Sequence, residues 1–294
     1  MQHETKSNIY RDASSLEPRA GELQALRHNL HRLCAPNPGP MTGPGTNTYL
    51  YGETELAVFD AGPLMSEHID NILACQEMLN APITALIASH THSDHSPAIA
   101  KLAEQLPNAQ IIGAPAEANQ EYEDHTFNPD FVPRDDDLLN LPHGRIRAIH
   151  TPGHVANHFC YLIEEHSLLT TGDHLMNGST VVIIPPKGNM QHYIQSLQKL
   201  ENYKIESMAP GHGALINNPK ELVAWTIKHR LDRESKVLRK LDGSASSLSE
   251  LVKLVYDDVD SGLHRIAELS LHAHLIKLEA EGKARETSQG WSLG

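Results

Sequence analysis

The sequence predicts an α/β domain followed by a smaller winged-helix unit, and three observations support this fold class. Short apolar runs of β type alternate with helical segments up to about residue 218. Beyond that point, three helical segments precede two short β runs, a pattern typical of a winged helix. The charge also divides there, since residues 1–218 carry 12 basic and 25 acidic side chains, whereas residues 219–294 carry 12 of each. We therefore predict two domains, 1–218 and 219–294.

The elements of the first domain are predicted from local patterns. Two β runs, 48–51 and 56–60, flank a short Gly-containing turn and predict a hairpin. Apolar residues at helical spacing predict a helix over 67–79. A buried strand is predicted at 83–88, and Ser96-Pro97 is a typical helix start. Further strands are predicted at 110–113, 145–151, 159–164, 168–171 and 180–184, and a helix at 190–202.

The second domain opens at Pro219 with a long predicted helix that reaches about residue 241. Two further helical segments are predicted near 248–257 and 262–281. A short β run after Gly282 and the final residues 291–293 complete the pattern as a hairpin. A winged helix of this kind binds DNA in some proteins and is only a packing or dimer module in others, so a homodimer is one possible assembly.

Composition narrows the compartment and the partners. The first 30 residues contain no apolar stretch that resembles a signal peptide, and no apolar run is long enough to cross a bilayer. Three cysteines are an odd count without paired spacing, which argues against a disulfide scaffold. The sequence therefore predicts a cytoplasmic protein that has no membrane partner.

The net charge of −13 disfavours non-specific binding of polyanions over most of the surface. Two Trp, eight Tyr and four Phe also provide few aromatic side chains for stacking of bases. Neither observation excludes a local cationic site, in particular one formed by metal ions.

A dense run of metal-ligand residue types follows the predicted strand 83–88. It reads His90-Thr-His-Ser-Asp-His95. In an extended segment His90, His92 and Asp94 project to one side, whereas His95 projects elsewhere and can meet a second metal. Imidazole and carboxylate groups suit zinc, and also manganese or iron. Further residues of these types stand where other predicted strands give way to loops: His154, Asp173 and His212.

Taken in order, these motifs resemble the metallo-β-lactamase superfamily. They are the His90–His95 run, Thr151-Pro-Gly-His154, Gly172-Asp173 and Gly211-His-Gly213, preceded by Asp60 at the end of an earlier strand. The resemblance covers about residues 35–215 and implies an αββα metallo-β-lactamase sandwich with the small winged-helix domain at its C-terminus. It assigns the first metal to His90, His92 and His154, the second to Asp94, His95 and His212, and the bridging position to Asp173.

Three further features resemble one branch of that superfamily, the β-lactamase-like hydrolases with an associated winged helix. They are Gly43-Pro-Gly-Thr-Asn47, the segment 151–158 and the winged-helix pattern itself. The branch includes a mitochondrial single-strand endoribonuclease. One departure is Pro97-Ala98, where many members have Gly-Gly. We expect the substrate to approach the site differently near these two residues.

The resemblance implies two divalent metal ions per chain, zinc first, which share Asp173 and a bridging hydroxide. Asp94 and Asp173 are the predicted catalytic carboxylates. We expect a dinuclear metal-dependent hydrolase of a small ester, thioester or phosphodiester. Two alternatives stay open: an endonuclease of single-stranded RNA, and a non-catalytic, metal-dependent regulator that binds DNA.

Four residues beside the motifs have either a functional or a structural interpretation. Asp60 either bonds a ligand histidine or closes a strand-end turn. Asn157 and His158 either orient substrate or make structural hydrogen bonds. His174 either lines the pocket as a proton donor or only packs there.

Overall fold

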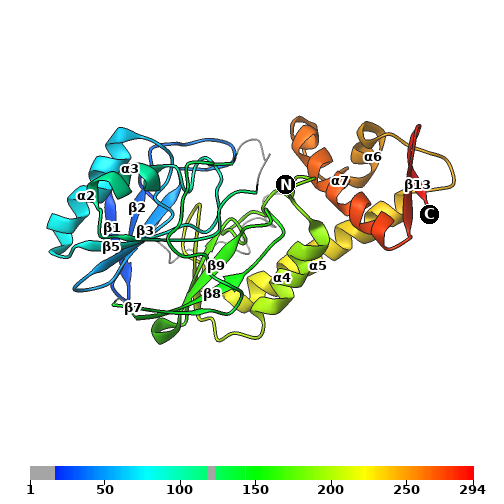
Figure 1. The fold of residues 1–294 in the computed structure, drawn as a ribbon. Coiled ribbons are helices and arrows are strands. Elements are labelled where there is room, and N and C mark those ends of the chain that lie inside the picture. Colours follow the sequence, from blue (N-terminus) through cyan, green and yellow to red (C-terminus); the bar gives the residue numbers. More distant parts are fainter. Residues whose placement is uncertain (1–16, 118–122, 143) are drawn as a thin grey trace. The chain divides into compact units, whose positions relative to one another are not determined.

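The computed structural model describes residues 17–117, 123–142 and 144–294 (Figure 1). The chain forms two compact units, each built from several segments. The described residues of the first unit lie within 1–151, 157–179 and 204–220, and those of the second lie within 152–156, 180–203 and 221–294. The domain boundary between residues 218 and 219 stays a prediction.

The first unit contains a six-stranded sheet in which the chain order is also the spatial order. Its first four strands pair antiparallel, and β4, β5 and β6 pair parallel. The hairpin predicted for residues 48–60 is confirmed, because β3 and β4 are antiparallel neighbours. The strands are β1 (Leu23–Arg27), β2 (Leu30–Cys34), β3 (Asn47–Tyr51), β4 (Leu56–Phe59), β5 (Ile83–Ile87) and β6 (Gln110–Ile112).

A five-stranded sheet in the same unit has the order β11-β10-β9-β8-β7. All pairs are antiparallel except β10 with β11, which run parallel. Its strands are β7 (Leu138–Leu141), β8 (Gly144–His150), β9 (Phe159–Ile163), β10 (Leu168–Gly172) and β11 (Ser207–Pro210). A one-turn 3-10 helix, η1 (Glu164–His166), connects β9 to β10.

The strand predicted over residues 180–184 is wrong, because these residues form neither helix nor strand. Val181 and Ile183 are buried, so the apolar run is used for packing. Its backbone bonds to side chains instead of to a strand: the carbonyl of Val181 accepts from Arg230, and that of Val182 lies 3.0 Å from His154 Nδ1.

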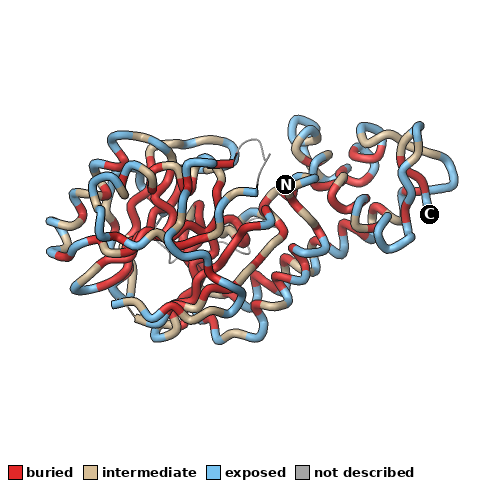
Figure 2. Tube along the Cα trace, viewed as in Figure 1, coloured by how far each residue is buried: buried red, intermediate tan, exposed pale blue. Residues whose placement is uncertain are grey.

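The core of the first unit lies between its two sheets. One cluster joins inward residues such as Tyr49 and Phe59 with Ile146 and Tyr161 of the second sheet. Alternate residues of the first sheet form a second cluster with α2 (Ser66–Leu79) and α3 (Ala98–Gln105), because successive side chains point to opposite faces. Strands with both faces covered are apolar along their length, and Figure 2 shows them as continuous buried segments.

The second unit contains α4 (Met190–Leu200), α5 (Pro219–Lys240), α6 (Leu248–Val255), η2 (Ser261–Leu263), α7 (His264–Ala280) and the hairpin β12 (Ala284–Thr287) with β13 (Gly290–Leu293). The predicted succession of helices and a final hairpin is confirmed. A capping box formed by Ser247 and Glu250 starts α6. Trp291 is buried with residues of α5, α6 and α7 and closes the core.

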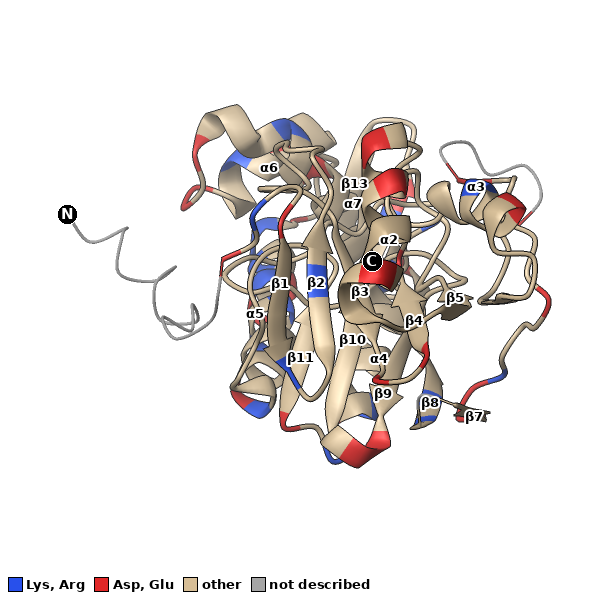
Figure 3. Cartoon of the chain, turned by 90° about the vertical axis from the view of Figure 1, so that its left-hand side faces the viewer, with Lys and Arg blue, Asp and Glu red and all other residues tan. Residues whose placement is uncertain are grey.

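Residues of both charge signs occur along α5 and along α6, and Figure 3 marks them by colour on the ribbon. Among the residues that the structure describes, no helix combines the length and the apolar character that a membrane crossing requires.

Candidate metal centre

The predicted ligands of the first unit lie in loops that follow strands. The loop after β5 carries the run His90–His95, Asp173 follows β10, and His212 follows β11. Because β4 and β5 run parallel, and β10 and β11 also run parallel, each pair of loops leaves its sheet at one edge. His154 belongs to the short segment 152–156.

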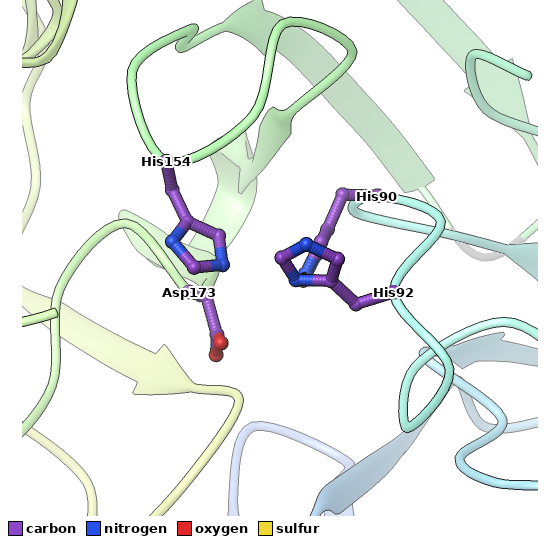
Figure 4. A group of neighbouring side chains, drawn as sticks. All are labelled: His90, His92, His154 and Asp173. Atoms are coloured by element: carbon purple, nitrogen blue, oxygen red, sulfur yellow. Dashed lines mark hydrogen bonds between the residues drawn. The ribbon is translucent and has the colours of Figure 1, made fainter. Parts of the chain in front are cut away.

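The structure brings the seven predicted ligands into two groups. Within each group, one ligand atom per residue lies within 4.8 Å of the others. The first group is His90, His92, His154 and Asp173, and the second is Asp94, His95 and His212. Figure 4 shows the first group, in which the loop after β5 supplies two rings and separate loops supply His154 and Asp173.

Distances in the second group suit a divalent ion. Nε2 of His95 lies 3.6 Å from Asp94 Oδ2 and 3.4 Å from Asp173 Oδ1. Nε2 of His212 lies 3.3 Å from Asp94 Oδ2 and 3.4 Å from Asp173 Oδ1. Ligands bonded at about 2.1 Å to one tetrahedral ion are about 3.4 Å apart. The carboxylate of Asp173 therefore has a place in both groups.

Hydrogen bonds on the outer side of the rings determine which nitrogen faces a metal. Ser89 donates its only hydroxyl proton to Asp60 Oδ2 at 2.8 Å, so it accepts from His90 Nδ1 at 2.9 Å. Asp60 Oδ2 also accepts from His95 Nδ1 at 3.0 Å. Nε2 of each ring is thus the nitrogen that faces the metal group, and it is the one that binds a metal when its proton is displaced.

Two other rings follow the same rule through backbone carbonyls. His212 Nδ1 donates to the carbonyl of Gly45 at 3.2 Å, and His154 Nδ1 donates to that of Val182 at 3.0 Å. The remaining nitrogen of His95 is buried and has no hydrogen-bond partner among the described residues. An unsatisfied buried polar atom costs about 1–3 kcal/mol, and a bound metal ion removes that cost. The donor set therefore fits metal ions.

The cluster favours positive charge. Burial lowers the pKa of His95, but Asp94, Asp173 and Asp60 outweigh it and hold this pKa well above its usual value. Burial raises the pKa of Asp94, yet His95 and His212 outweigh it and lower this pKa to about 2. A cation that binds here replaces protons on the same ligands, so affinity and pH are linked.

The four residues beside the motifs lie close to these groups. Asp60 bonds Ser89 and His95, and its backbone has a positive φ of 50° directly after β4. His158 lies 2.9 Å from Thr151 Oγ1 through Nδ1 and accepts the Asp173 backbone N–H through Nε2. A structural hydrogen bond, one of the two interpretations of His158, is therefore present.

Neither Asn157 nor His174 belongs to the two groups. Asn157 donates to the hydroxyl of Thr91 at 2.7 Å and to the carbonyls of Ala114 and Pro115. His174 is fully buried, and its ring centroid lies 5.9 Å from that of His158. Whether either residue contacts substrate stays a prediction.

Ser89 and Glu123 shape the groups but were not found from the sequence, whereas Thr46 and Gly211 lie within quoted motifs that gave them no role. Ser89 orients two partners, Thr46 donates to Asp94 Oδ2 at 3.2 Å, and Glu123 Oε1 lies 3.4 Å from His92 Nε2. At Gly211, a Cβ would lie 2.7 Å from His95 Cε1. Ser89 and Gly211 each precede a predicted ligand, which is a usable signal, whereas Glu123 has no local pattern that distinguishes it.

A cavity of about 190 Å³ adjoins the second group, because His212 is among the residues that line it. Its apolar lining includes Met41, Pro44 and Met176. Its polar lining includes Glu17. All of these residues belong to the first unit.

Known families and proteins match most of the chain. The family described as the metallo-beta-lactamase superfamily matches residues 41–212, and the beta-lactamase associated winged helix domain matches residues 247–291. These matches confirm the resemblance and the fold class inferred from the motifs.

Two curated relatives span most of the chain. The first is a beta-lactamase-like protein 2 homolog of Drosophila melanogaster, 29% identical over 284 residues, which cover 88% of this chain and 91% of the relative. The second is an atrochrysone carboxyl ACP thioesterase of Aspergillus fumigatus, 29% identical over 227 residues, which cover 76% and 68%.

Two solved structures share the fold. A beta-lactamase domain protein from Burkholderia ambifaria has a TM-score of 0.81 at 18% identity and covers 99% of both chains. A metallo-beta-lactamase family protein from Thermus thermophilus has a TM-score of 0.75 at 20% identity and covers 92% of this chain and 100% of its own.

Proposed function

The chain belongs to the metallo-β-lactamase superfamily and is a metal-dependent hydrolase, and we propose that it uses two divalent metal ions, zinc first, to hydrolyse a small ester or thioester. The observation that carries this proposal is the convergence of ligand atoms in two groups that meet at Asp173. Bound there, the ions would lower the pKa of a coordinated water and polarise the scissile carbonyl group.

We assign the first ion to His90, His92 and His154, and the second to Asp94, His95 and His212, with Asp173 shared. The protein's own contribution is to hold these groups in the ligating form. Hydrogen bonds from the rings to Ser89, Asp60 and backbone carbonyls hold a proton on each outward nitrogen, so that the inward nitrogens face the metal positions. The two carboxylates, Asp94 and Asp173, balance part of the positive charge.

The cavity beside His212 supports a small substrate group. Its volume of about 190 Å³ is below the roughly 300–1,000 Å³ of pockets that enclose drug-sized ligands. Met41, Pro44 and Met176 offer apolar contacts, whereas Glu17 disfavours an anionic group in the same space. A short, uncharged acyl or alcohol group fits this lining.

The thioester class is supported by the relative named as an ACP thioesterase. A small phosphodiester is also compatible with the metal groups. A long polyanion such as single-stranded RNA is disfavoured, because residues 1–218 carry 25 acidic and 12 basic side chains.

The test is a measurement of metal content followed by a substrate panel. The purified protein, loaded with Zn²⁺, Mn²⁺ or Fe²⁺, is assayed with a 4-nitrophenyl ester, an acyl-N-acetylcysteamine thioester, bis(4-nitrophenyl) phosphate and single-stranded RNA. We expect close to two metal ions per chain and metal-dependent turnover of the ester or the thioester. Absence of metal binding, or turnover of RNA alone, would refute the proposal.

A further inference from the structure

We propose that Glu123 is a positioning residue for His92: it orients the imidazole so that Nδ1 faces the first metal group, and it thereby sets the metal affinity of that group. The inference rests on the proposed function, and it concerns a residue outside every motif that the family resemblance assigns.

The carboxylate of Glu123 is held from several directions. It is buried, with 8% of the residue exposed. Oε2 accepts the hydroxyl proton of Thr91 at 2.6 Å, and Oε1 lies 3.4 Å from His92 Nε2. The backbones of His92 and Glu123 form a β-bridge, and the next residue, Asp124, donates its N–H to the carbonyl of Thr91 at 2.6 Å. Backbone pairing therefore holds the carboxylate of Glu123 beside the ring of His92.

A directed chain of hydrogen bonds leads to this carboxylate. Asn157 donates to Thr91 Oγ1 at 2.7 Å, and Thr91 has only one hydroxyl proton, which it gives to Glu123. One oxygen of Glu123 is thus occupied by Thr91, and the other faces the ring of His92. Asn157 takes part in positioning through this chain, in which Thr91 and Glu123 lie between it and the ring of His92.

The neighbouring histidine explains why the protonation of His92 matters. Nδ1 of His92 lies 3.0 Å from Nε2 of His90. The proton of His90 lies on Nδ1, which donates to Ser89, so its Nε2 carries a lone pair. A carboxylate beside Nε2 of His92 favours a proton on that nitrogen, so Nδ1 is the nitrogen that is available to a metal.

The 3.0 Å contact between these two nitrogens can be satisfied by one shared proton or by a metal ion that both nitrogens face. Glu123 favours the second arrangement, because it holds the ring of His92 with Nδ1 towards the metal group. A carboxylate behind a ligand histidine also raises the basicity of the ring, and removal of such a partner lowers metal affinity by about 10- to 100-fold.

The experiment measures Zn²⁺ affinity by competition with a chromophoric chelator, together with the visible spectrum of the Co²⁺-loaded protein. Glu123→Gln retains the size of the side chain and removes its charge. We expect one of two zinc equivalents to weaken by about 10- to 100-fold while the other keeps its affinity, and we expect the Co²⁺ spectrum to change. A purely structural role would weaken both equivalents together and lower the unfolding temperature.

Glu234→Gln is the matched control. Glu234 is a buried carboxylate of the second unit that lies 3.7 Å from His274 Nδ1 and 2.9 Å from Lys277 Nζ. We expect this variant to change stability but not metal affinity. If Glu123→Gln does not fold, Glu123→Asp, which shortens the side chain but keeps its charge, replaces it with the same expected direction.

Wild-type affinity for both equivalents in a folded Glu123 variant overturns the inference and leaves the proposed function intact. Failure of the unmodified protein to bind Zn²⁺ or Co²⁺ instead overturns the proposed function, so the two failures are distinguishable.

Discussion

Gly211→Ala should disrupt the metal groups through one added methyl group. The new Cβ would lie 2.7 Å from His95 Cε1, 2.9 Å from Asp173 Oδ1 and 3.0 Å from the carbonyl oxygen of Gly172. Non-bonded carbon atoms rest about 3.5–4.0 Å apart, so the His95 ring must move by about 0.8 Å or more. The backbone carbonyl on the other side limits any shift of the methyl group itself.

That displacement is large for a metal site, because ligand distances tolerate only about ±0.2 Å. We expect Zn²⁺ affinity to fall by at least about 10- to 100-fold, as when a ligand loses its orientation. Overpacking should also lower the free energy of unfolding by about 1–3 kcal/mol.

The assay combines zinc competition with thermal unfolding of the metal-free protein. Gly243→Ala is the control, because a Cβ at Gly243 meets nothing within 4 Å. This control should keep wild-type affinity and stability. A Gly211→Ala protein that binds two zinc ions as tightly as the unmodified chain would show that His95 is not held as the structure describes.

Three further predictions use separate measurements. Asp173→Asn should lower zinc stoichiometry and turnover together, since Asp173 Oδ1 lies 3.4 Å from both His95 and His212; full activity with one bound ion would contradict this. Burial lowers the pKa of His68 to about 4 in the folded chain, whereas the ordinary pKa in the unfolded chain is about 6.5. As the pH falls, the unfolded chain therefore binds a proton on His68 before the folded chain does. The free energy of unfolding should then fall by about 3 kcal/mol between about pH 6.5 and pH 4. Urea unfolding at several pH values tests this, and His68→Gln should flatten the profile. Finally, cleavage of single-stranded RNA should be weak, and its rate should fall when the salt concentration is raised. The rate of ester turnover should not fall under the same change.

Short-range patterns allowed much of the candidate site to be predicted. The spacing of His90, His92 and Asp94 depends only on the alternation of side chains in an extended segment. The hairpin of β3 and β4 follows from two β runs and a turn, and the helices of the second unit follow from apolar periodicity and capping. The family resemblance then supplied which distant residues belong together.

Other features depend on contacts between segments that are far apart in the chain. The apolar run 180–184 has the composition of a strand, yet its carbonyls bond to Arg230 and His154 instead of to a neighbouring strand. Glu123 reaches His92 only because the backbone returns beside it.

The residue types and their local order thus predicted most of the elements and, together with the family resemblance, the candidate ligands. Tertiary structure alone decided which nitrogen of each ring faces the metal groups, since that depends on partners such as Ser89, Asp60 and Gly45 across the fold. The physical reason is the distance along the sequence over which each effect acts. Periodicity and capping involve residues a few positions apart, whereas these hydrogen bonds and close contacts join distant segments and form only when the chain has packed.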